Sequence, residues 1–570
     1  MMALAIAMVM VICTMNFAVM AAPGDLSVNS TLTVSGLGEK DTVKYYQLLK
    51  WDPDDPNGWV WGNGVTVDAD GKVGGHTVED IIGDKDHRKD GQNLITDVIA
   101  GDLAGAVGTA ATPAGTNKNG TWSVEGVDAG LYMVIVTSKT PGTMYNPIFV
   151  AANFYGNNEQ PDSSNTWAVT SDATYSNTAM AKMSKIPGDK EASGTDDGDP
   201  DTVKVGDVID YAVTSKIPKF ASNYTNPMFQ IDDELTGLEL ETVPKVYAVA
   251  ADDTETLLTD GTEYDLLDGG AVGDDNYSIK FKEAYIKGVT HPGQKIVIKY
   301  QAKVTTDAIQ SVNELTNEIE IKFSIDPDPN KGYGIIRDVT NHFTFSLDAD
   351  LLGDMYENES ATEAIKVGLD AEGNPVVSEQ SYAFSSASHA ALEGATFKLY
   401  TDEGCNTVYT NDIYPNGCEV VSDASGRLTI LGLDVGNYWL KEESAPMGFI
   451  KAQEPIPVVI TADITEDVEI VDEVDYDGTP VEVTYYTNVL NGYTVTVGGG
   501  TTTYEIRNSK YIATSVEIDP DSSDGELVNT KGVELPATGG IGTTIFYVIG
   551  AILVLGAGIL LVTRRRMDTI

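Results

Sequence analysis

Apolar and polar side chains alternate over several stretches in the middle of the chain. The clearest runs cover residues 295–304, 317–325 and 343–347. Because successive side chains of a strand point to opposite faces, a period of two predicts strands with one buried and one solvent-facing side. Turn-forming residues recur between the runs, and a single helical pattern is expected, at 90–103. The pattern predicts an all-β chain of tandem immunoglobulin-like β-sandwich domains.

The two ends of the chain do not fit this pattern. Residues 1–22 carry no charge and end in small residues, which is typical of a secretory signal peptide cleaved near Ala22. Residues 541–562 are also uncharged, and about 20 such residues suffice to cross a membrane. Arginines at 564–566 follow at once and predict that this end is cytoplasmic. The body of the chain is therefore expected outside the cell.

Shifts in composition indicate where domains end. A Gly-, Asp- and Pro-rich loop covers 192–201, and Asp326–Asn330 is predicted to be a linker because proline is excluded from central strands. We therefore place domains at 23–183, 184–330 and 331–533, followed by a tail at 534–570 that contains the membrane helix.

Charge and motif content narrow the possible functions. The 570 residues include 36 Lys and Arg against 86 Asp and Glu, a net charge of −50. This excludes nucleic acid as a partner, because binding a polyanion needs a basic surface. The five histidines have no metal-ligand spacing, and no nucleophile elbow or phosphate loop occurs. The sequence predicts no metal, no cofactor and no enzyme activity, and an anchored hydrolase has no motif in its favour.

Two cysteines remain after removal of the signal peptide. In an oxidising compartment Cys405 and Cys418 are expected to form a disulfide. Closing that short loop would contribute about 3 kcal/mol in the loop-entropy model. The alternative is a pair of free buried thiols.

The tail carries a specific motif. Leu535, Pro536, Ala537, Thr538 and Gly539 precede the apolar segment and the arginines. This order resembles the LPxTG cell-wall sorting signal of surface proteins of Gram-positive bacteria. The resemblance implies that a sortase cleaves between Thr538 and Gly539 and passes the Thr538 carbonyl to an amine.

The third domain adds a second resemblance. Residues 438–449, with Glu442, resemble the "E box" of major pilins, while 392–400 and 528–532 resemble the opening and closing strands of their CnaB-type sandwich. In that family a Lys, an Asn and this Glu form an internal amide (isopeptide) cross-link. Glu442 and Asn529 match, but the expected first strand, 344–351, contains no lysine. Two interpretations stay open: Glu442 and Asn529 belong to such a cross-link with a lysine elsewhere, or Glu442 only hydrogen-bonds the backbone.

The middle domain fits the same pattern more completely. Its resemblance to CnaA-type pilin domains implies an isopeptide bond between Lys190 and Asn317, with Asp233 as the acid. Burial favours the neutral form of both lysine and carboxylic acid, so the amine becomes a nucleophile and the acid can move protons. The alternative is an exposed Lys190 and an edge-strand asparagine.

The first domain is expected to carry the lysine that receives the next subunit. In pilins this lysine follows a Tyr-Pro, but here Asn177 stands where that lysine is expected, two residues after Tyr175. The nearest lysines are Lys182, which we favour, and Lys185.

Together these features resemble a sortase-assembled major (backbone) pilin. The resemblance implies a structural subunit of a covalent surface pilus that supports adhesion, with sortase, further copies of itself and peptidoglycan as partners. The alternative is a single-copy wall-anchored adhesin or minor pilin that binds a host or matrix ligand.

Overall fold

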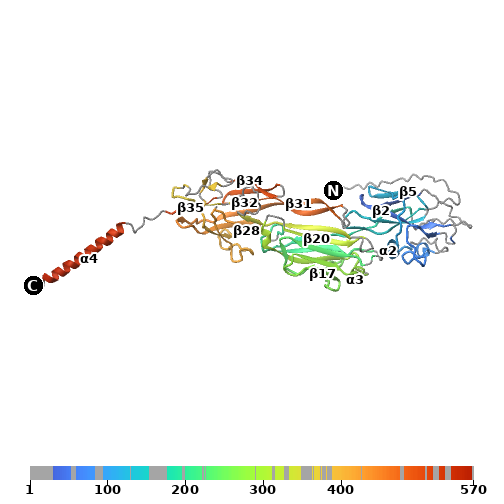
Figure 1. Cartoon of the computed structure of the whole chain (residues 1–570), viewed down its shortest axis with the longest axis horizontal. Helices are drawn as coiled ribbons and strands as arrows, with labels where there is room; N and C mark the ends of the chain where they lie inside the picture. Colours follow the sequence, from blue (N-terminus) through green and yellow to red (C-terminus); the bar gives the residue numbers. More distant parts are fainter. Residues whose placement is uncertain are drawn as a thin grey trace.

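Three β-rich domains follow one another along an elongated molecule, and a separate C-terminal helix extends from its end (Figure 1). The all-β prediction is confirmed. This computed structural model describes residues 30–567 except 53–54, 56–58, 84–93, 129, 141, 153–175, 196–198, 221–223, 225, 289, 311–314, 326–332, 348–362, 364, 373, 375–379, 382–387, 390, 425, 475–479, 508–509, 518–525 and 533–540. The predicted signal peptide and the sorting motif lie outside the described residues.

The N-terminal domain packs two four-stranded sheets and a two-stranded one. The first sheet contains β4 (Thr116–Lys118), β5 (Thr121–Val127), β1 (Ser30–Ser35) and β9 (Thr178–Met180). The second contains β3 (Trp59–Trp61), β2 (Thr42–Trp51), β6 (Gly130–Thr137) and β8 (Ile148–Ala152). The pair is β7 (Thr143–Tyr145) and β10 (Met183–Lys185), and the helices are α1 (Val78–Ile82) and α2 (Asp97–Gly105). Helix α2 overlaps the helical pattern at 90–103.

The middle domain is a sandwich of two sheets around a core of aliphatic and aromatic side chains. One sheet contains β11 (Asp189–Ser193), β12 (Val208–Lys216), β19 (Lys295–Val304), β15 (Lys245–Val249), β16 (Glu255–Leu257) and β14 (Leu238–Leu240). The other contains β17 (Tyr264–Gly269), β18 (Asn276–Phe281), β13 (Phe229–Leu235), β20 (Leu315–Ser324) and β21 (Tyr333–His342). A short helix, α3, covers Glu283–Ile286.

The boundary expected at residue 330 is wrong. Strand β21 pairs with β20 along its whole length, from Leu315 opposite His342 to Ser324 opposite Tyr333. The proline-containing segment 326–330, which lies outside the described residues, thus connects two neighbouring strands of one sheet. The middle domain therefore extends to His342.

The C-terminal domain is built on one seven-stranded sheet. Its strands, in spatial order, are β27 (Glu419–Val421), β26 (Thr396–Tyr400), β29 (Gly436–Ser444), β31 (Ile456–Val474), β32 (Pro480–Val497), β33 (Gly500–Arg507) and β34 (Lys510–Glu517). Smaller sheets pair β22 (Phe345–Leu347) with β28 (Ile430–Leu433), β24 (Gln380–Ser381) with β25 (Ser388–His389), and β35 (Glu526–Lys531) with both β23 (Ile365–Leu369) and β30 (Phe449–Ile450).

The middle and C-terminal domains are joined by polar contacts as well as by the chain. The long hairpin of β31 and β32 lies along the middle domain (Figure 1). Asn341 Nδ2, on β21, donates to Thr487 Oγ1 at 2.5 Å, and Asn488 Nδ2 donates to Asp201 Oδ1 at 2.6 Å. These contacts fix the two domains side by side at the hairpin.

The predicted disulfide is wrong, because Cys405 and Cys418 are both free thiols. Cys418 is buried in the C-terminal core, where burial raises the pKa of its thiol to about 12. Cys405 lies in a turn in which Asp402 accepts hydrogen bonds from the backbone N–H groups of Asn406 and Thr407. That turn keeps the Cys405 thiol beside the Glu403 carbonyl, away from the core.

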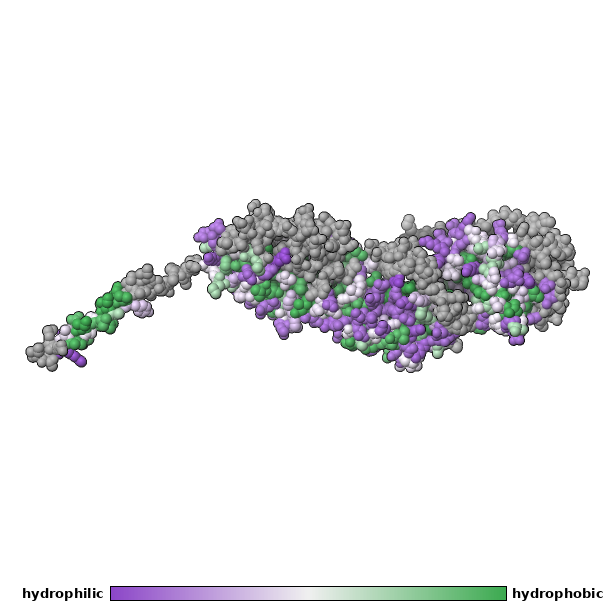
Figure 2. All heavy atoms as spheres, in the orientation of Figure 1, coloured by the Kyte–Doolittle hydropathy of each residue, from purple (hydrophilic) through white to green (hydrophobic). Residues whose placement is uncertain are grey.

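Helix α4 (Ile541–Met567) contains a stretch, Tyr547–Arg565, that is long and apolar enough to cross a membrane. Within Tyr547–Arg565 none of the stretch is buried against the residues that the structure describes, and its apolar side chains are exposed (Figure 2). A lipid bilayer would cover this surface, as the sequence predicts.

Candidate functional site

The first candidate site lies between the two sheets of the middle domain. On β11 the side chain of Asp189 faces solvent, so the alternation of the strand turns Lys190 inward. Asp233 on β13 and Asn317 on β20 belong to the opposite sheet, where the two strands pair directly. The lysine side chain therefore crosses the core to reach both of them.

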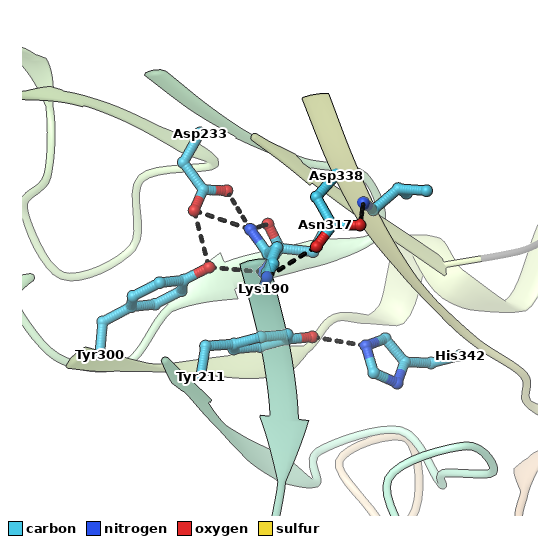
Figure 3. A network of polar contacts seen from close by, with 8 residues as sticks. Lys190, Tyr211, Asp233, Tyr300, Asn317, Asp338 and His342 are labelled. Carbon is cyan, nitrogen blue, oxygen red and sulfur yellow. Dashed lines mark hydrogen bonds and ion pairs between the residues drawn. The ribbon is translucent and has the colours of Figure 1, made fainter. Parts of the chain in front are cut away.

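The three predicted residues meet in a closed hydrogen-bonded network (Figure 3). Lys190 Nζ lies 2.8 and 2.7 Å from the two carboxylate oxygens of Asp233 and 2.5 Å from Asn317 Oδ1. The side chains of Lys190 and Asp233 are both 0% exposed. The geometry thus excludes the exposed-lysine alternative.

Aromatic residues close the site. Tyr300, on β19, donates from its hydroxyl to Asp233 Oδ2 at 2.8 Å and accepts from Asn317 Nδ2 at 2.7 Å. Tyr211, on β12, stacks on Tyr300 with ring centroids 5.1 Å apart, and its hydroxyl meets His342 Nε2 at 2.7 Å. The sequence does not single out these two tyrosines, because every buried tyrosine of an alternating strand follows the same pattern.

Burial controls the charges here. Loss of hydration lowers the pKa of Lys190 to about 8, although the attraction of Asp233 opposes this shift. Asp338, whose carboxylate accepts from the Lys190 backbone N–H at 2.7 Å, has its pKa raised to about 6, also by burial. A lysine with this lowered pKa is neutral far more often than an exposed one, and its nitrogen then has a free electron pair beside an amide.

A second lysine is buried in the C-terminal domain. The sequence placed the first strand of this domain, and thus its expected lysine, at 344–351. In the structure the strand that pairs with the closing strand β35 is β23, and its Lys366 is fully buried. The sequence did contain a signal, since Lys366 interrupts the apolar run Ile365–Leu369. The expectation that the third domain lacks a suitable lysine is therefore corrected.

Lys366 faces the two residues that the sequence singled out. Its Nζ lies 3.3 Å from Glu442 Oε1, and Asn529 Nδ2 donates to Glu442 Oε2 at 2.7 Å. Burial lowers the pKa of Lys366 to about 8. Glu442 Oε2 also accepts from the Ala452 N–H at 2.6 Å, in agreement with the expected backbone contact.

Lys366 Nζ and Glu442 Oε1 meet only as an ion pair at 3.3 Å, and Asn529 Oδ1 has no hydrogen-bond partner among the described residues. A buried polar atom without a partner costs typically about 1–3 kcal/mol. An arrangement that keeps them together is typical of a reactive site rather than of one that only stabilises the fold.

The two candidate acceptor lysines lie at the boundary between the first and middle domains. Lys182 is exposed in the connection between β9 and β10, and its carbonyl accepts from the Asn146 N–H at 3.2 Å. Lys185, also exposed, ends β10 opposite Thr143. Both amines can thus be reached by another molecule, and Met180 and Met183 beside them are 76% and 54% exposed.

The last strand, β35, lies at the end of the elongated body from which helix α4 extends (Figure 1). Lys531 pairs with Phe449, and the Gly532 N–H donates to the Gly448 carbonyl at 2.7 Å. The sorting motif, outside the described residues, follows three residues later. Among the described residues, no group of His, Cys, Asp or Glu side chains could hold a metal ion.

Comparisons with known proteins identify the class of two segments. Residues 383–474 match the prealbumin-like fold domain, and residues 528–569 match the LPXTG cell wall anchor motif. The chain therefore carries a cell-wall anchor segment and, in its C-terminal domain, a prealbumin-like domain.

The chain as a whole is similar to the trypsin-resistant surface T6 protein of Streptococcus pyogenes serotype M6, with 24% identity over 511 residues, covering 83% of this chain and 86% of the relative. The solved T6 backbone pilin, described as a modular three-domain structure, is 18% identical with a TM-score of 0.52, covering 89% of this chain and all of that one. The major pilin SpaD from Corynebacterium diphtheriae is 19% identical, with a TM-score of 0.43. The match covers 75% of this chain and 89% of SpaD. The resemblance to wall-anchored pilins is confirmed.

Proposed function

We propose that this protein is the structural subunit of a covalently polymerised surface pilus. The observation that carries the proposal is a three-domain backbone-pilin fold over nearly the whole chain, with a cell-wall anchor signal at its end. A transient membrane helix, α4, would hold the chain at the surface until it is processed.

Polymerisation would use two separate points of the molecule, the junction of the first and middle domains and the C-terminal sorting motif. Sortase breaks the Thr538–Gly539 peptide bond, releasing the amino group of Gly539, and the Thr538 carbonyl passes to Lys182 Nζ of another copy, which loses a proton as the new amide forms. The exposure of Lys182, on a connection between strands, supports this choice over Lys185 within β10. The last subunit would be passed to peptidoglycan, and the assembled fibre would support adhesion.

Two internal cross-links would stiffen each subunit. Lys190 would bond to Asn317 with Asp233 as the acid, and Lys366 to Asn529 with Glu442 as the acid, each reaction releasing ammonia. In both sites the carboxylate contacts the amine, and all three groups are buried; in the first site the amine also contacts the amide oxygen, and in the second the carboxylate contacts the amide nitrogen. Direct attack on an amide requires such a sheltered arrangement.

The polymer is tested by incubating the full chain with its sortase and examining the products after boiling in detergent. We expect a ladder of high-mass species that collapses for Lys182→Ala. Lys118→Ala, which removes an exposed lysine of the same domain, should leave the ladder intact. A ladder that persists in Lys182→Ala and disappears in Lys185→Ala would assign the acceptor to Lys185. A single anchored species for the unaltered chain would support the single-copy adhesin instead.

The internal bonds are tested by the intact mass of the folded protein. Two bonds lower the mass by about 34 Da, since each releases one ammonia of about 17 Da. Asn317→Ala and Asn529→Ala should each abolish one of the two losses. A chain of full sequence mass would refute both bonds.

A further inference from the structure

We propose that Tyr300 is a catalytic residue, a proton relay, in the formation of the Lys190–Asn317 bond. This inference rests on the internal cross-link proposed above and assigns a step of that reaction to a residue that the lysine–asparagine–acid scheme does not include.

The hydroxyl of Tyr300 joins the acid to the leaving group. It donates to Asp233 Oδ2 at 2.8 Å and accepts from Asn317 Nδ2, the nitrogen that must depart, at 2.7 Å (Figure 3). The side chains of Tyr300 and Asn317 are buried, which leaves bulk water poorly placed to carry this proton.

Asp233 is placed to receive a proton but not to deliver it. Both of its carboxylate oxygens contact Lys190 Nζ, at 2.8 and 2.7 Å, whereas Asn317 Nδ2 donates to Tyr300. Tyr300 therefore connects Asp233, which takes the proton from Lys190, to Asn317 Nδ2, which must receive one.

The second site supports this assignment by contrast. There Asn529 Nδ2 donates directly to Glu442 Oε2 at 2.7 Å, and Lys366 Nζ lies over the ring of Phe397, which has no hydroxyl, 5.3 Å from its centroid. Glutamate is longer than aspartate by one methylene group. The longer acid reaches the leaving nitrogen by itself, while the shorter one reaches it through Tyr300.

Formation of the Lys190–Asn317 bond moves two protons from Lys190 and releases the amide nitrogen of Asn317. Lys190 gives one proton to Asp233, and the neutral amine attacks Cγ of Asn317. As the Cγ–Nδ2 bond breaks, Tyr300 gives its hydroxyl proton to Nδ2 and takes the proton held by Asp233. The nitrogen of Lys190 loses a second proton to Asp233 as the amide forms, and ammonia leaves. The site is electrically neutral before and after.

Tyr300 has to donate and accept within one step. Burial and the neighbouring Asp233 raise the pKa of its hydroxyl well above the ordinary value, so a free phenolate is strongly disfavoured. The relay therefore moves two protons together, which gives the experiment a specific signature.

The test compares Tyr300→Phe with the unaltered full chain, each recovered unfolded in urea at full sequence mass, before either bond has formed, then diluted to start folding and sampled over time by intact mass and peptide mapping. We expect the Lys190–Asn317 loss of ammonia to be about 100-fold slower in the variant, within the range for general acid–base catalysis. The loss of ammonia at Lys366 and Asn529 should keep its rate and serves as an internal control.

Tyr277→Phe is the matched control. Its hydroxyl is equally buried and lies close to Asp233 and Tyr300 but meets no hydrogen-bond partner among the described residues, and its ring packs edge-on against Tyr300 with centroids 5.2 Å apart. This variant should form the bond at the normal rate. Equal rates for Tyr300→Phe and the unaltered chain, or equal slowing in both variants, would overturn the relay while leaving the cross-link intact. An unaltered chain that never loses ammonia at Lys190 would refute the cross-link, and the relay with it.

A second measurement covers the case in which Tyr300→Phe does not fold, as judged by circular dichroism. The rate of bond formation in the unaltered chain is followed in mixtures of H₂O and D₂O. Two protons moving together give a curved dependence on the deuterium fraction. A linear dependence would overturn the relay.

Discussion

Single residues decide whether this molecule can cross-link itself. A buried ion pair rarely stabilises a fold, because desolvation of both charges offsets their attraction. Lys190 and Lys366 each form such a pair, between side chains that are 0% exposed. In the proposed reaction, conversion to a neutral amide would remove the buried charges and with them the cost of burying them.

At this scale we expect Glu442→Gln to block the bond of the C-terminal domain, because glutamine cannot accept a proton from Lys366 Nζ. The mass loss should fall by about 17 Da, and the domain should lose roughly 4–5 kcal/mol of stability as the closed loop opens. Mass spectrometry and urea unfolding measure the two effects. Glu443→Gln, on the next residue of β29, changes a side chain that bonds Tyr400 instead and should leave the mass unaffected.

His342 gives a pH-dependent prediction. Burial lowers its pKa from 6.5 to about 4, so between these values the unfolded chain binds a proton that the folded chain does not. The free energy of unfolding should therefore rise with pH across this window, by about 3 kcal/mol. Asp338, with a pKa raised to about 6, acts in the opposite direction.

The two contributions are separated by comparing urea midpoints of the unaltered chain and His342→Asn from pH 4 to 7. Asparagine can still donate to the Pro200 carbonyl, as His342 Nδ1 does, but it does not titrate. The difference between the two proteins should grow as the pH rises. An unchanged difference would show that His342 is not the group that titrates.

At the scale of elements, period-two patterning predicted strands well but not their partners. Strand β20 was recognised from its alternation, and the Lys190 site followed from resemblance. The proline-rich segment after β20 looked like a linker, because local sequence does not show that β21 returns to pair with β20. Lys366 was missed for the same reason, since β23 pairs with β35 in parallel, far away in the sequence. The disulfide prediction was wrong because a bond between Cys405 and Cys418 depends on the direction in which each thiol points, which the sequence does not show.

The contact between β21 and β32 gives a prediction at this scale. Asn341→Ala removes the donor to Thr487 Oγ1 and to the Asn488 carbonyl, both across the domain junction. We expect a loss of about 1–3 kcal/mol, as for other buried hydrogen bonds left half-made. Hydrogen exchange should accelerate in β21 and β32 while β13 and β18 stay protected. Uniform acceleration would show that the contact stabilises the middle domain as a whole.

For the whole molecule, the proposed bonds define how tension would cross a fibre. Force entering at Lys182 would pass from Lys190 to Asn317, skipping the 126 residues between them, and then from Lys366 to Asn529. The segment 318–365, which includes β21, would remain in the path between the two bonds. Its pairing with β20 and its contacts with β32 then decide the mechanical strength of the subunit.

Single-molecule pulling between residues 182 and 538 tests this path. The unaltered chain should extend only through segments outside the two closed loops. Asn317→Ala should add an unfolding step of roughly 400 Å, because 127 residues at about 3.5 Å each become extensible. An identical extension for both proteins would contradict the proposed path.

One further consequence follows from the position of Lys182 at the C-terminal end of the first domain. Strands β1 to β8 all precede the point where a neighbouring subunit would be attached. Tension along an assembled fibre would not pass through these strands, so the first domain would lie beside the load-bearing path. It would need no internal cross-link to resist that tension, and changes in its loops would not weaken the fibre.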